Sequence, residues 1–339
     1  MKICYLVDNM EPKHGGGRYA GDLIAAVKER GYDAGILEVN SILDAVKVRK
    51  YCKNCDIIHA IDGYPYGVVA ALANFGLNKK IVITVQGTYA VAPLYRFGKA
   101  AFVKWAYRKA DKIIAISRYT KREILKKINI QNIEVINHGV YFNEFYKEPM
   151  ESEEKFILSV GGLKYRKGYH ISIPAFALAK KEIPDLKYKI ISGYKDEAYF
   201  DELKKIAMRC GVEKDIEFLS GLSDESRNNL YRKAKLFILT SVNENHHFEG
   251  FGLVFLEAAA AGLPVIGTLE NGIEDAVKNN FNGTLVSQND IKATAEALLK
   301  ILKDEQWRKE LSLNSFSWAK DNDWSRVWPK YIEIYRNFA

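Results

Sequence analysis

The chain has 339 residues, 48% of them hydrophobic and 27% charged, with a formal net charge of +8. At about 100–200 residues per domain this length predicts two domains, and the composition excludes long disordered regions. No apolar run approaches the ~18 residues of a membrane-spanning helix, and the first apolar run is too short for a signal peptide. We therefore expect a cytoplasmic protein, with contact at the inner face of a membrane as a further expectation.

The positive charge is concentrated in one segment. Residues 96–127 hold 11 basic residues against Asp111 and Glu123. Read as a helix, its centre has a basic face that carries an indole, opposite an apolar face that includes Phe102. The residues of the basic face are Lys104, Trp105, Arg108, Lys109 and Lys112. This face predicts docking to an anionic membrane or an acidic acceptor, and a solvated helix is an equal alternative. Nucleic acid is not expected as a partner, because no recognition motif accompanies the segment.

Four cysteines are too few for a disulfide scaffold in a chain of this length, so we expect free thiols. Cys52 and Cys55 form a single C-x-x-C pair without a second pair or neighbouring histidines. Zinc binding or redox chemistry is therefore not expected.

A strand, a glycine-rich loop and a helix open the chain. Residues 2–7 read as a buried strand, glycines 15–17 as a loop, and the residues up to about Arg30 as an amphipathic helix. Strand and helix patterns then alternate. The further strands expected in this half are residues 34–39, 57–60, 80–85, 112–116 and 133–136. Ser117 is expected to cap the helix that follows it.

The same order of elements begins again near residue 155. A strand at 155–160 precedes a loop at 161–168 and a helix over about 169–181. The later strands expected are residues 187–192, 216–219, 236–240 and 264–267. Continuous apolar strands with helical connections predict an α/β protein with two doubly wound, Rossmann-like parallel sheets that face a cleft. We place the first domain at residues 1–148, the second at 149–320, and a C-terminal helix that crosses back to the first domain at 321–339.

The loop and helix between the last two predicted strands carry the strongest signal for chemistry. Gly250 and Gly252 let the backbone approach a ligand, and a helix that begins near Leu253 points its free N–H groups at an anion. Glu249 precedes this helix, and Glu257 lies about one turn inside it. This arrangement predicts a phosphate site flanked by two carboxylates.

On these residues the sequence resembles the retaining glycosyltransferases with the GT-B fold, of the family 4 type (glycosyl transferases group 1). Two glutamates separated by seven residues, followed by E-A-x-A-x-G-x-P-V-I, mark that group, and Glu249 and Glu257 have this spacing. Weaker matches occur in the same order at residues 15–17, 115–118, 135–140, 160–168 and 270–274. The resemblance implies an enzyme of polysaccharide or glycolipid biosynthesis. It would transfer a sugar, with retention, from a nucleoside-diphosphate sugar of the UDP or GDP type to a glycan or lipid-linked acceptor.

The resemblance also implies that the first domain binds the acceptor and the second domain the nucleotide sugar, and it implies roles for single residues. The catalytic set would be Glu249, Lys167 and Gln86, with Lys167 on the diphosphate and Glu249 on the donor sugar near its anomeric carbon. Glu257 would accept hydrogen bonds from the ribose. The remaining donor-binding residues would be Gly16, Gly17, Arg166, Gly250, Phe251, Gly252 and Leu253. Basic side chains and helix dipoles would replace a metal, so neither a metal nor another cofactor is expected.

Two positions depart from the family pattern. Gln86 stands where many members have a histidine, and glutamine can hydrogen-bond but does not titrate near neutral pH. It could equally be a loop amide with no part in the reaction. Gly162 stands where many members have an arginine, so phosphate binding would depend on Lys167, Arg166 and backbone amides.

Three other functions are compatible with parts of the sequence. A silent relative could keep the nucleotide-sugar site without turnover. An NAD-dependent oxidoreductase is suggested by G-x-G-x-x-A at residues 15–20 with Glu38 beyond it, although residues 8–14 separate these glycines from the strand. A nucleotide-sugar epimerase could share the fold. The paired glutamates, together with Lys167, favour the transferase.

Overall fold

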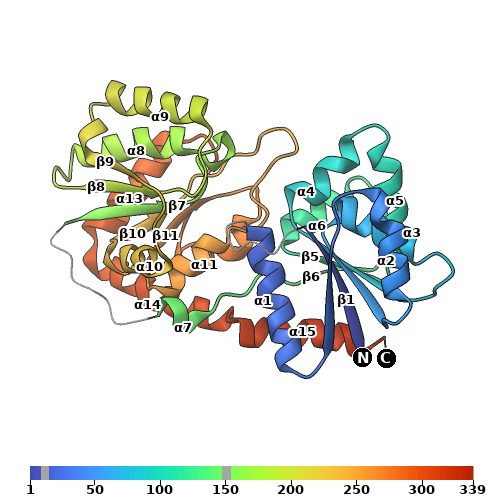
Figure 1. Ribbon diagram of the computed structural model, residues 1–339. Coiled ribbons are helices and arrows are strands. Elements are labelled where there is room, and N and C mark those ends of the chain that lie inside the picture. Colours follow the sequence, from blue (N-terminus) through green and yellow to red (C-terminus); the bar gives the residue numbers. More distant parts are fainter. Residues whose placement is uncertain (9–14, 147–153, 339) are drawn as a thin grey trace. The chain divides into compact units, whose positions relative to one another are not determined.

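The computed structural model describes residues 1–8, 15–146 and 154–338 (Figure 1). The chain divides into two compact units. The first comprises Met1–His138 and Ser325–Ala339, and the second comprises Gly139–Trp324. Each unit is built on its own parallel sheet.

The first unit contains a six-stranded parallel sheet in the order β2-β1-β3-β4-β5-β6. Its strands are β1 (Lys2–Val7), β2 (Asp33–Glu38), β3 (Ile57–Ile61), β4 (Lys80–Val85), β5 (Lys112–Ala115) and β6 (Ile133–Val135). Its helices are α1 (Gly15–Glu29), α2 (Ala45–Cys52), α3 (Val68–Ala73), α4 (Thr88–Val91), α5 (Lys99–Lys109), α6 (Arg118–Leu125) and α15 (Trp324–Arg336). The central strands are continuous apolar runs because helices cover both faces of the sheet.

A buried chain of polar side chains joins α15 to this sheet. His59 on β3 contacts the Tyr335 hydroxyl through Nδ1 (2.7 Å) and the Thr84 hydroxyl through Nε2 (2.8 Å). The Tyr335 hydroxyl also lies 3.0 Å from that of Tyr5 on β1. Burial lowers the pKa of His59 to about 3, so the ring is neutral. These hydrogen bonds give His59 a structural role and attach the C-terminal helix to the first unit.

The second unit repeats the architecture, with strand order β12-β11-β10-β7-β8-β9. Its strands are β7 (Phe156–Val160), β8 (Lys187–Ile191), β9 (Ile216–Leu219), β10 (Leu236–Ile238), β11 (Val265–Thr268) and β12 (Gly283–Val286). Its helices are α7 (Phe142–Phe145), α8 (Tyr169–Lys180), α9 (Glu197–Arg209), α10 (Asp224–Lys233), α11 (Leu253–Ala260), α12 (Ile273–Ala276), α13 (Ile291–Lys303) and α14 (Glu305–Asp321). The predicted class, two doubly wound parallel sheets, is confirmed.

The units divide at 138/139 and 324/325, whereas the sequence analysis places the divisions at 148/149 and 320/321. Backbone hydrogen bonds explain the difference. The N–H of Val140 donates to the Asn322 carbonyl, and the N–H of Trp324 donates to the Val140 carbonyl, each at 3.0 Å. The indole of Trp324 also packs closely on Gly139. Residues 139–146 therefore belong with the second unit.

The glycine-rich stretch near the start of the chain is not a loop. Helix α1 begins at Gly15, so Gly16 and Gly17 lie in its first turn. Residues 9–14, which precede it, are outside the described residues. The expected cap of α6 is present, because Ser117 Oγ accepts the N–H of Thr120 at 3.0 Å.

Candidate functional site

A tight turn after β7 positions two cations in the second unit. Gly168 ends this turn with φ 72°, and a Cβ there would lie 1.7 Å from the carbonyl oxygen of Thr240. The Thr240 hydroxyl donates to the Gly168 carbonyl (2.7 Å), and the N–H of Val242 donates to the Arg166 carbonyl (2.8 Å). Only glycine fits this position, and the segment after β10 thereby fixes Arg166 and Lys167.

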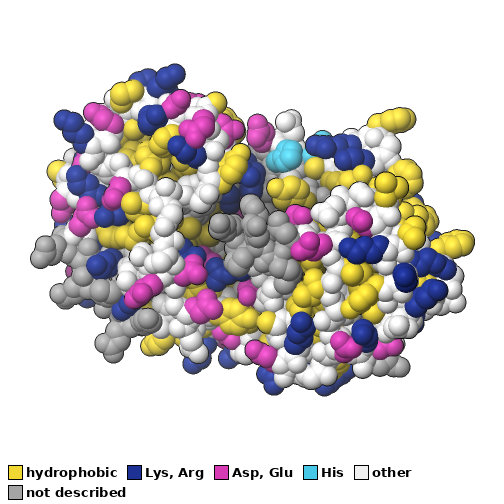
Figure 2. All heavy atoms as spheres, in the orientation of Figure 1, with side chains coloured by type: hydrophobic (Ala, Val, Ile, Leu, Met, Phe, Trp, Pro, Cys, Tyr) yellow, Lys and Arg dark blue, Asp and Glu magenta, His cyan; other side chains and the backbone are white. Residues whose placement is uncertain are grey.

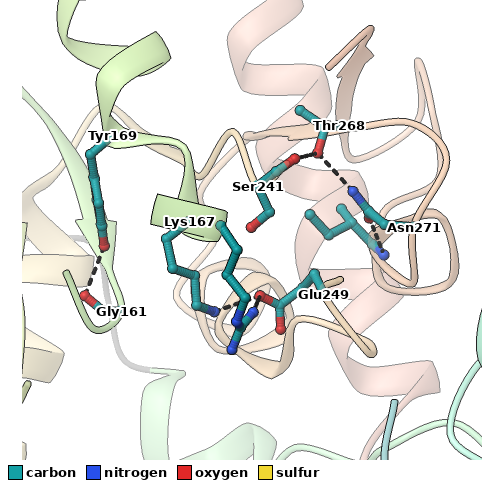
Figure 3. A network of polar contacts seen from close by, with 9 residues as sticks. Gly161, Lys167, Tyr169, Ser241, Glu249, Thr268 and Asn271 are labelled. Atoms are coloured by element: carbon teal, nitrogen blue, oxygen red, sulfur yellow. Dashed lines mark hydrogen bonds and ion pairs between the residues drawn. The ribbon is translucent and has the colours of Figure 1, made fainter. Parts of the chain in front are cut away.

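Both cations meet one carboxylate oxygen. Lys167 Nζ lies 2.5 Å and Arg166 Nη1 3.0 Å from Glu249 Oε2 (Figure 3). The side chains of Lys167 and Glu249 are 13% and 12% exposed. Of the three predicted catalytic residues, Lys167 and Glu249 are therefore in direct contact.

The electrostatics of this cluster favour an ionised carboxylate. Burial opposes ionisation of Glu249, but attraction to Lys167 and Arg166 outweighs it and lowers the pKa to about 2. Burial also lowers the pKa of Lys167, although Glu249 acts in the opposite direction. The cluster carries two cations against one anion, and this excess positive charge suits an anionic ligand.

The predicted glycine loop and helix follow Glu249 directly. Gly252 has φ 86° and immediately precedes α11, whose first residue is Leu253. Gly250 is held against a neighbouring loop, because a Cβ at Gly272 would lie 2.0 Å from the Gly250 carbonyl oxygen. Phe251 is buried, so its side chain serves packing.

Glu257 lies on α11 with the predicted sequence spacing from Glu249, but its side chain has a different hydrogen-bond partner. Its Oε2 accepts a hydrogen bond from the Tyr231 hydroxyl of α10 at 3.1 Å, and the residue is 5% exposed. The two glutamates of the motif are thus held separately, Glu249 by cations and Glu257 by a tyrosine.

Several polar residues around the cluster were not singled out from the sequence. The Thr268 hydroxyl donates to the Ser241 carbonyl (2.6 Å), and the Asn271 amide donates to Thr268 Oγ1 (2.9 Å). Ser241 Oγ is buried without a hydrogen-bond partner among the described residues, and in Figure 3 it points toward Lys167 and Glu249. Their position at the carboxyl end of β10 or β11, or within three residues of it, is the sequence signal that could have identified these residues.

Gln86, the third predicted catalytic residue, lies in the first unit directly after β4. Its N–H donates to Asp62 Oδ1 at 3.4 Å, and Asp62 directly follows the neighbouring strand β3. Asp62 was not predicted. A buried acidic residue at a strand end is the signal that could have found it.

The predicted basic face is only partly present. Lys104, Trp105, Arg108 and Lys109 lie on α5, but this helix ends at Lys109. Lys112 is the first residue of β5 and pairs with Glu134 at 2.8 Å, so it does not belong to this face. Phe102 was expected on the buried side and is 53% exposed, whereas Val103, Ala106 and Tyr107 are buried. Figure 2 shows apolar and basic side chains together on the first unit, where Figure 1 places α4 and α5.

Two side-chain groups bear on metal binding. Cys4 joins Cys52 and Cys55 in a buried cluster whose sulfur atoms all lie within 4.8 Å of one another. A hydrogen bond to Cys52, together with burial, raises the pKa of Cys4, and burial raises that of Cys55 to about 11, which favours neutral thiols at these two positions. The hydrogen bond with Cys4 lowers the pKa of Cys52. Asp321 and Asp323 form an Asp-x-Asp sequence that the sequence analysis overlooked. Asp323 Oδ2 accepts the N–H of Phe142 at 2.9 Å and so holds the end of α14.

Both halves of the chain match models of one class of enzyme. Residues 141–318 match the model for glycosyl transferases group 1, and residues 37–143 match the model for glycosyltransferase family 4. An uncharacterized glycosyltransferase of Methanocaldococcus jannaschii is 28% identical over 304 residues, which are 89% of this chain and 82% of the relative. A GDP-mannose-dependent phosphatidylinositol monomannoside mannosyltransferase of Mycolicibacterium smegmatis is 25% identical, with 78% and 73% coverage.

Solved structures share the fold. HepE of Anabaena, in complex with UDP-glucose, superposes with a TM-score of 0.82 over 99% of this chain and 100% of that one, at 19% identity. WaaG, a glycosyltransferase involved in lipopolysaccharide biosynthesis, gives a TM-score of 0.74 over 98% and 99%, at 18% identity. These likenesses confirm the expected GT-B fold.

Proposed function

Because the chain belongs to the glycosyl transferases group 1 family of sugar-transferring enzymes, we propose that it uses a nucleoside-diphosphate sugar of the UDP or GDP type. The acceptor is a glycan or lipid-linked sugar, and the anomeric configuration is retained. The observation that carries the proposal is the pair of cations on Glu249, directly ahead of the N-terminus of α11. The donors bound by HepE and used by the mycobacterial mannosyltransferase support the donor class.

In this proposal Lys167 and Arg166 bind the diphosphate of the donor. Negative charge grows on the leaving nucleotide as the glycosidic bond breaks, and these two cations stabilise it together with the N–H groups of Gly250, Gly252 and Leu253. The positive end of α11 adds to the same field. In the free protein one carboxylate, that of Glu249, pairs with both cations. The incoming diphosphate replaces this carboxylate as their partner.

Glu249 and Glu257 then contact different parts of the donor. Release of the cations frees the Glu249 carboxylate to orient the donor sugar and to stabilise positive charge near its anomeric carbon. Its pKa of about 2 keeps it ionised at neutral pH. Glu257, which the Tyr231 hydroxyl holds, accepts hydrogen bonds from the ribose.

In this proposal the acceptor binds the first unit, which also contributes Gln86 and the first turn of α1. Gln86 hydrogen-bonds substrate without transferring a proton, because its amide does not titrate. Gly16 and Gly17 approach the diphosphate through their backbone, which a Cβ would hinder. Since cations and a helix N-terminus supply the positive charge, the reaction requires no metal.

Nucleotide release from a panel of UDP- and GDP-sugars, with octyl glucoside, galactoside and mannoside as acceptor probes and with EDTA or Mg²⁺ present, tests this proposal. We expect release from one donor at similar rates in both conditions, and a loss of at least about 100-fold in Lys167→Ala, the scale for one group that stabilises a charged transition state. Lys195→Ala is the matched control, because Lys195 is half-exposed and pairs with Glu197 on the surface. Binding without release would indicate the silent relative, and release only with Mg²⁺ would contradict metal independence.

We further propose that α5 and the segment before it dock on an anionic membrane, where a lipid-linked acceptor resides. Tyr89, Phe97 and Phe102 are 67%, 107% and 53% exposed, next in sequence to the basic residues of α5. Exposed aromatic rings beside cations are typical of surfaces that bind anionic lipid. No helix among the residues that the structure describes is long and apolar enough to cross a bilayer.

Flotation with vesicles that contain anionic lipid tests the docking proposal. We expect wild type to float, and the double variant Phe97→Ser/Phe102→Ser and the variant Arg108→Glu to bind less. Leu313→Ser, which removes a 70% exposed apolar side chain from α14, is the matched control. Failure of wild type to float, or unchanged flotation of both α5-region variants, would contradict the proposal.

A further inference from the structure

A buried aspartate lies at the carboxyl end of the sheet in the first unit. Asp62 directly follows β3, and Gln86 directly follows the neighbouring strand β4. Open parallel sheets bind their ligands beyond the carboxyl ends of their strands. Asp62 therefore lies at the ligand-binding edge, in contact with a residue that the proposed mechanism uses.

The backbone of Asp62 is strained. Its φ of 122° and ψ of 166° lie in a region that is essentially restricted to glycine. Neighbouring contacts hold it there: the N–H of Gly67 donates to the Asp62 carbonyl (3.1 Å), and the Tyr107 hydroxyl occupies the space where Gly63 would carry a Cβ. Glycine would adopt this conformation without strain, so an aspartate here indicates that its side chain has a function.

Burial of the Asp62 carboxyl group costs free energy that its local hydrogen bonds do not require. Both of its hydrogen bonds in the structure end on Oδ1, which accepts the N–H groups of Gly63 (2.7 Å) and Gln86 (3.4 Å). The residue is 6% exposed, and among the described residues it forms no ion pair. Asparagine would accept the same N–H groups without a charge. The second oxygen, Oδ2, is what aspartate adds at this position.

Burial raises the pKa of Asp62 to about 7, against the effect of its two backbone hydrogen bonds. Among the residues that the structure describes, its charge acts on two titratable groups, Tyr66 and Tyr107. Burial raises the pKa of both, and the charge of Asp62 raises it further; Asp8 also acts on Tyr66. Both phenols are neutral near pH 7, so of these three described groups Asp62 is the one whose charge changes in that range.

We propose that Asp62 binds a hydroxyl group of the sugar acceptor, which donates a hydrogen bond to Oδ2. The inference rests on the proposed function, in which the acceptor binds the first unit. A carboxylate accepts a hydroxyl proton in a shorter and stronger hydrogen bond than an amide does. Because Oδ1 holds the backbone of Gln86, one side chain fixes both the acceptor and the neighbouring loop.

The test compares full-length Asp62→Asn and Asp62→Gly with wild type. Asparagine keeps Oδ1 and the shape of the side chain. Glycine fits the observed φ and ψ, so this variant provides a folded protein if asparagine does not. Asp44→Asn is the matched control, because the Asp44 carboxyl also accepts two backbone N–H groups, from Asn40 and Ser41, but lies on the exposed surface before α2.

Steady-state transfer from the donor that wild type uses is measured with octyl glucoside, galactoside and mannoside as acceptor probes. We expect kcat/KM for the acceptor to fall about 10- to 100-fold in both Asp62 variants, the range for a hydrogen bond to a charged group, with donor KM unchanged. In wild type kcat/KM for the acceptor should rise with pH through about 7. The rise should be absent in Asp62→Asn and present in Asp44→Asn.

The other outcomes separate this inference from the proposed function. Transfer by wild type with unchanged acceptor constants in both variants would overturn the role of Asp62 alone. An equal loss of donor and acceptor binding would make Asp62 a structural residue. Absence of transfer by wild type from every donor would contradict the proposed function and this inference with it.

Discussion

Replacing Glu249 by glutamine removes the charge that Lys167 and Arg166 share and preserves the shape of the side chain. The carboxyl has a pKa of about 2 against an ordinary value of 4.5. At 1.36 kcal/mol per unit this shift corresponds to about 3 kcal/mol of folding stability. Because the pKa is lowered in the folded protein, this stability is present above pH 4.5 and is lost as the pH falls through 2. Removal of one partner from a buried ion pair costs about 3–5 kcal/mol, a range that agrees with this value.

We therefore expect Glu249→Gln to lower the free energy of unfolding at pH 7 by about 3 kcal/mol, measured by urea denaturation followed by circular dichroism. Glu197→Gln is the control, because its 71% exposed carboxylate also pairs with a lysine. An exposed pair contributes about 0–1 kcal/mol, so this variant should be close to wild type.

The same variant tests how the cations bind nucleotide. In Glu249→Gln no carboxylate competes with the diphosphate for Lys167 and Arg166, so UDP or GDP should raise the melting temperature more than in wild type. Transfer should nevertheless be lost. A free energy of unfolding within 1 kcal/mol of wild type, together with equal nucleotide-induced shifts in melting temperature, would refute the reasoning. Glu249 would then not be what holds Lys167 and Arg166 in place for phosphate.

Three further perturbations address other parts of the molecule. Gly168→Ala should cost more than about 2 kcal/mol in urea denaturation, because its Cβ would overlap the Thr240 carbonyl, whereas Gly211→Ala, at a similar φ in open space, should cost about 1. Between pH 7 and pH 5 the neutral, buried His59 should lower the free energy of unfolding by about 2 kcal/mol, because its pKa of about 3 in the folded protein lies below the unfolded value. In His59→Gln this part of the pH dependence of the unfolding free energy should disappear from urea titrations. Asp62→Gly should melt higher than wild type at pH 8, since it relieves about 1–3 kcal/mol of backbone strain and removes a buried charge, and an unchanged or lower melting temperature would contradict that account.

Most of the fold could be predicted because buried parallel strands are continuous apolar runs. Strands β1, β4 and β9 were predicted with their observed bounds, and the other predicted strands differ from the observed ones by one or two residues at one or both ends. Strand β12 was missed, since Gly283 to Val286 is short, begins with glycine and lies at a half-buried sheet edge. The boundary between the units was placed ten residues too late because it depends on long-range pairing of Val140 with Asn322 and Trp324.

The candidate site also contains residues that were predicted from the sequence and residues that were not. The contact of Glu249 with Lys167 could be predicted from the sequence, because the motif and the loop after β7 each indicated a residue at a strand end. Asp62 and Ser241 were not predicted. Their positions after strands are visible in the sequence, but the strained backbone of Asp62 and the unsatisfied hydroxyl of Ser241, which single them out, are not. Lys112 was placed on the basic face of a helix because the charge period continued past Lys109, where the helix ends.

Binding of UDP, GDP, ADP and their sugar conjugates, followed by thermal shift in wild type and Glu257→Ala, tests the central claim most directly. A ligand at about 100 times its dissociation constant stabilises a protein by about 2.7 kcal/mol. The account predicts that one UDP or GDP compound raises the melting temperature of wild type and that Glu257→Ala, which lacks the carboxylate proposed for the ribose, responds less. Absence of a shift with every nucleotide, or an equal shift in both proteins, would contradict the donor site assigned to this motif.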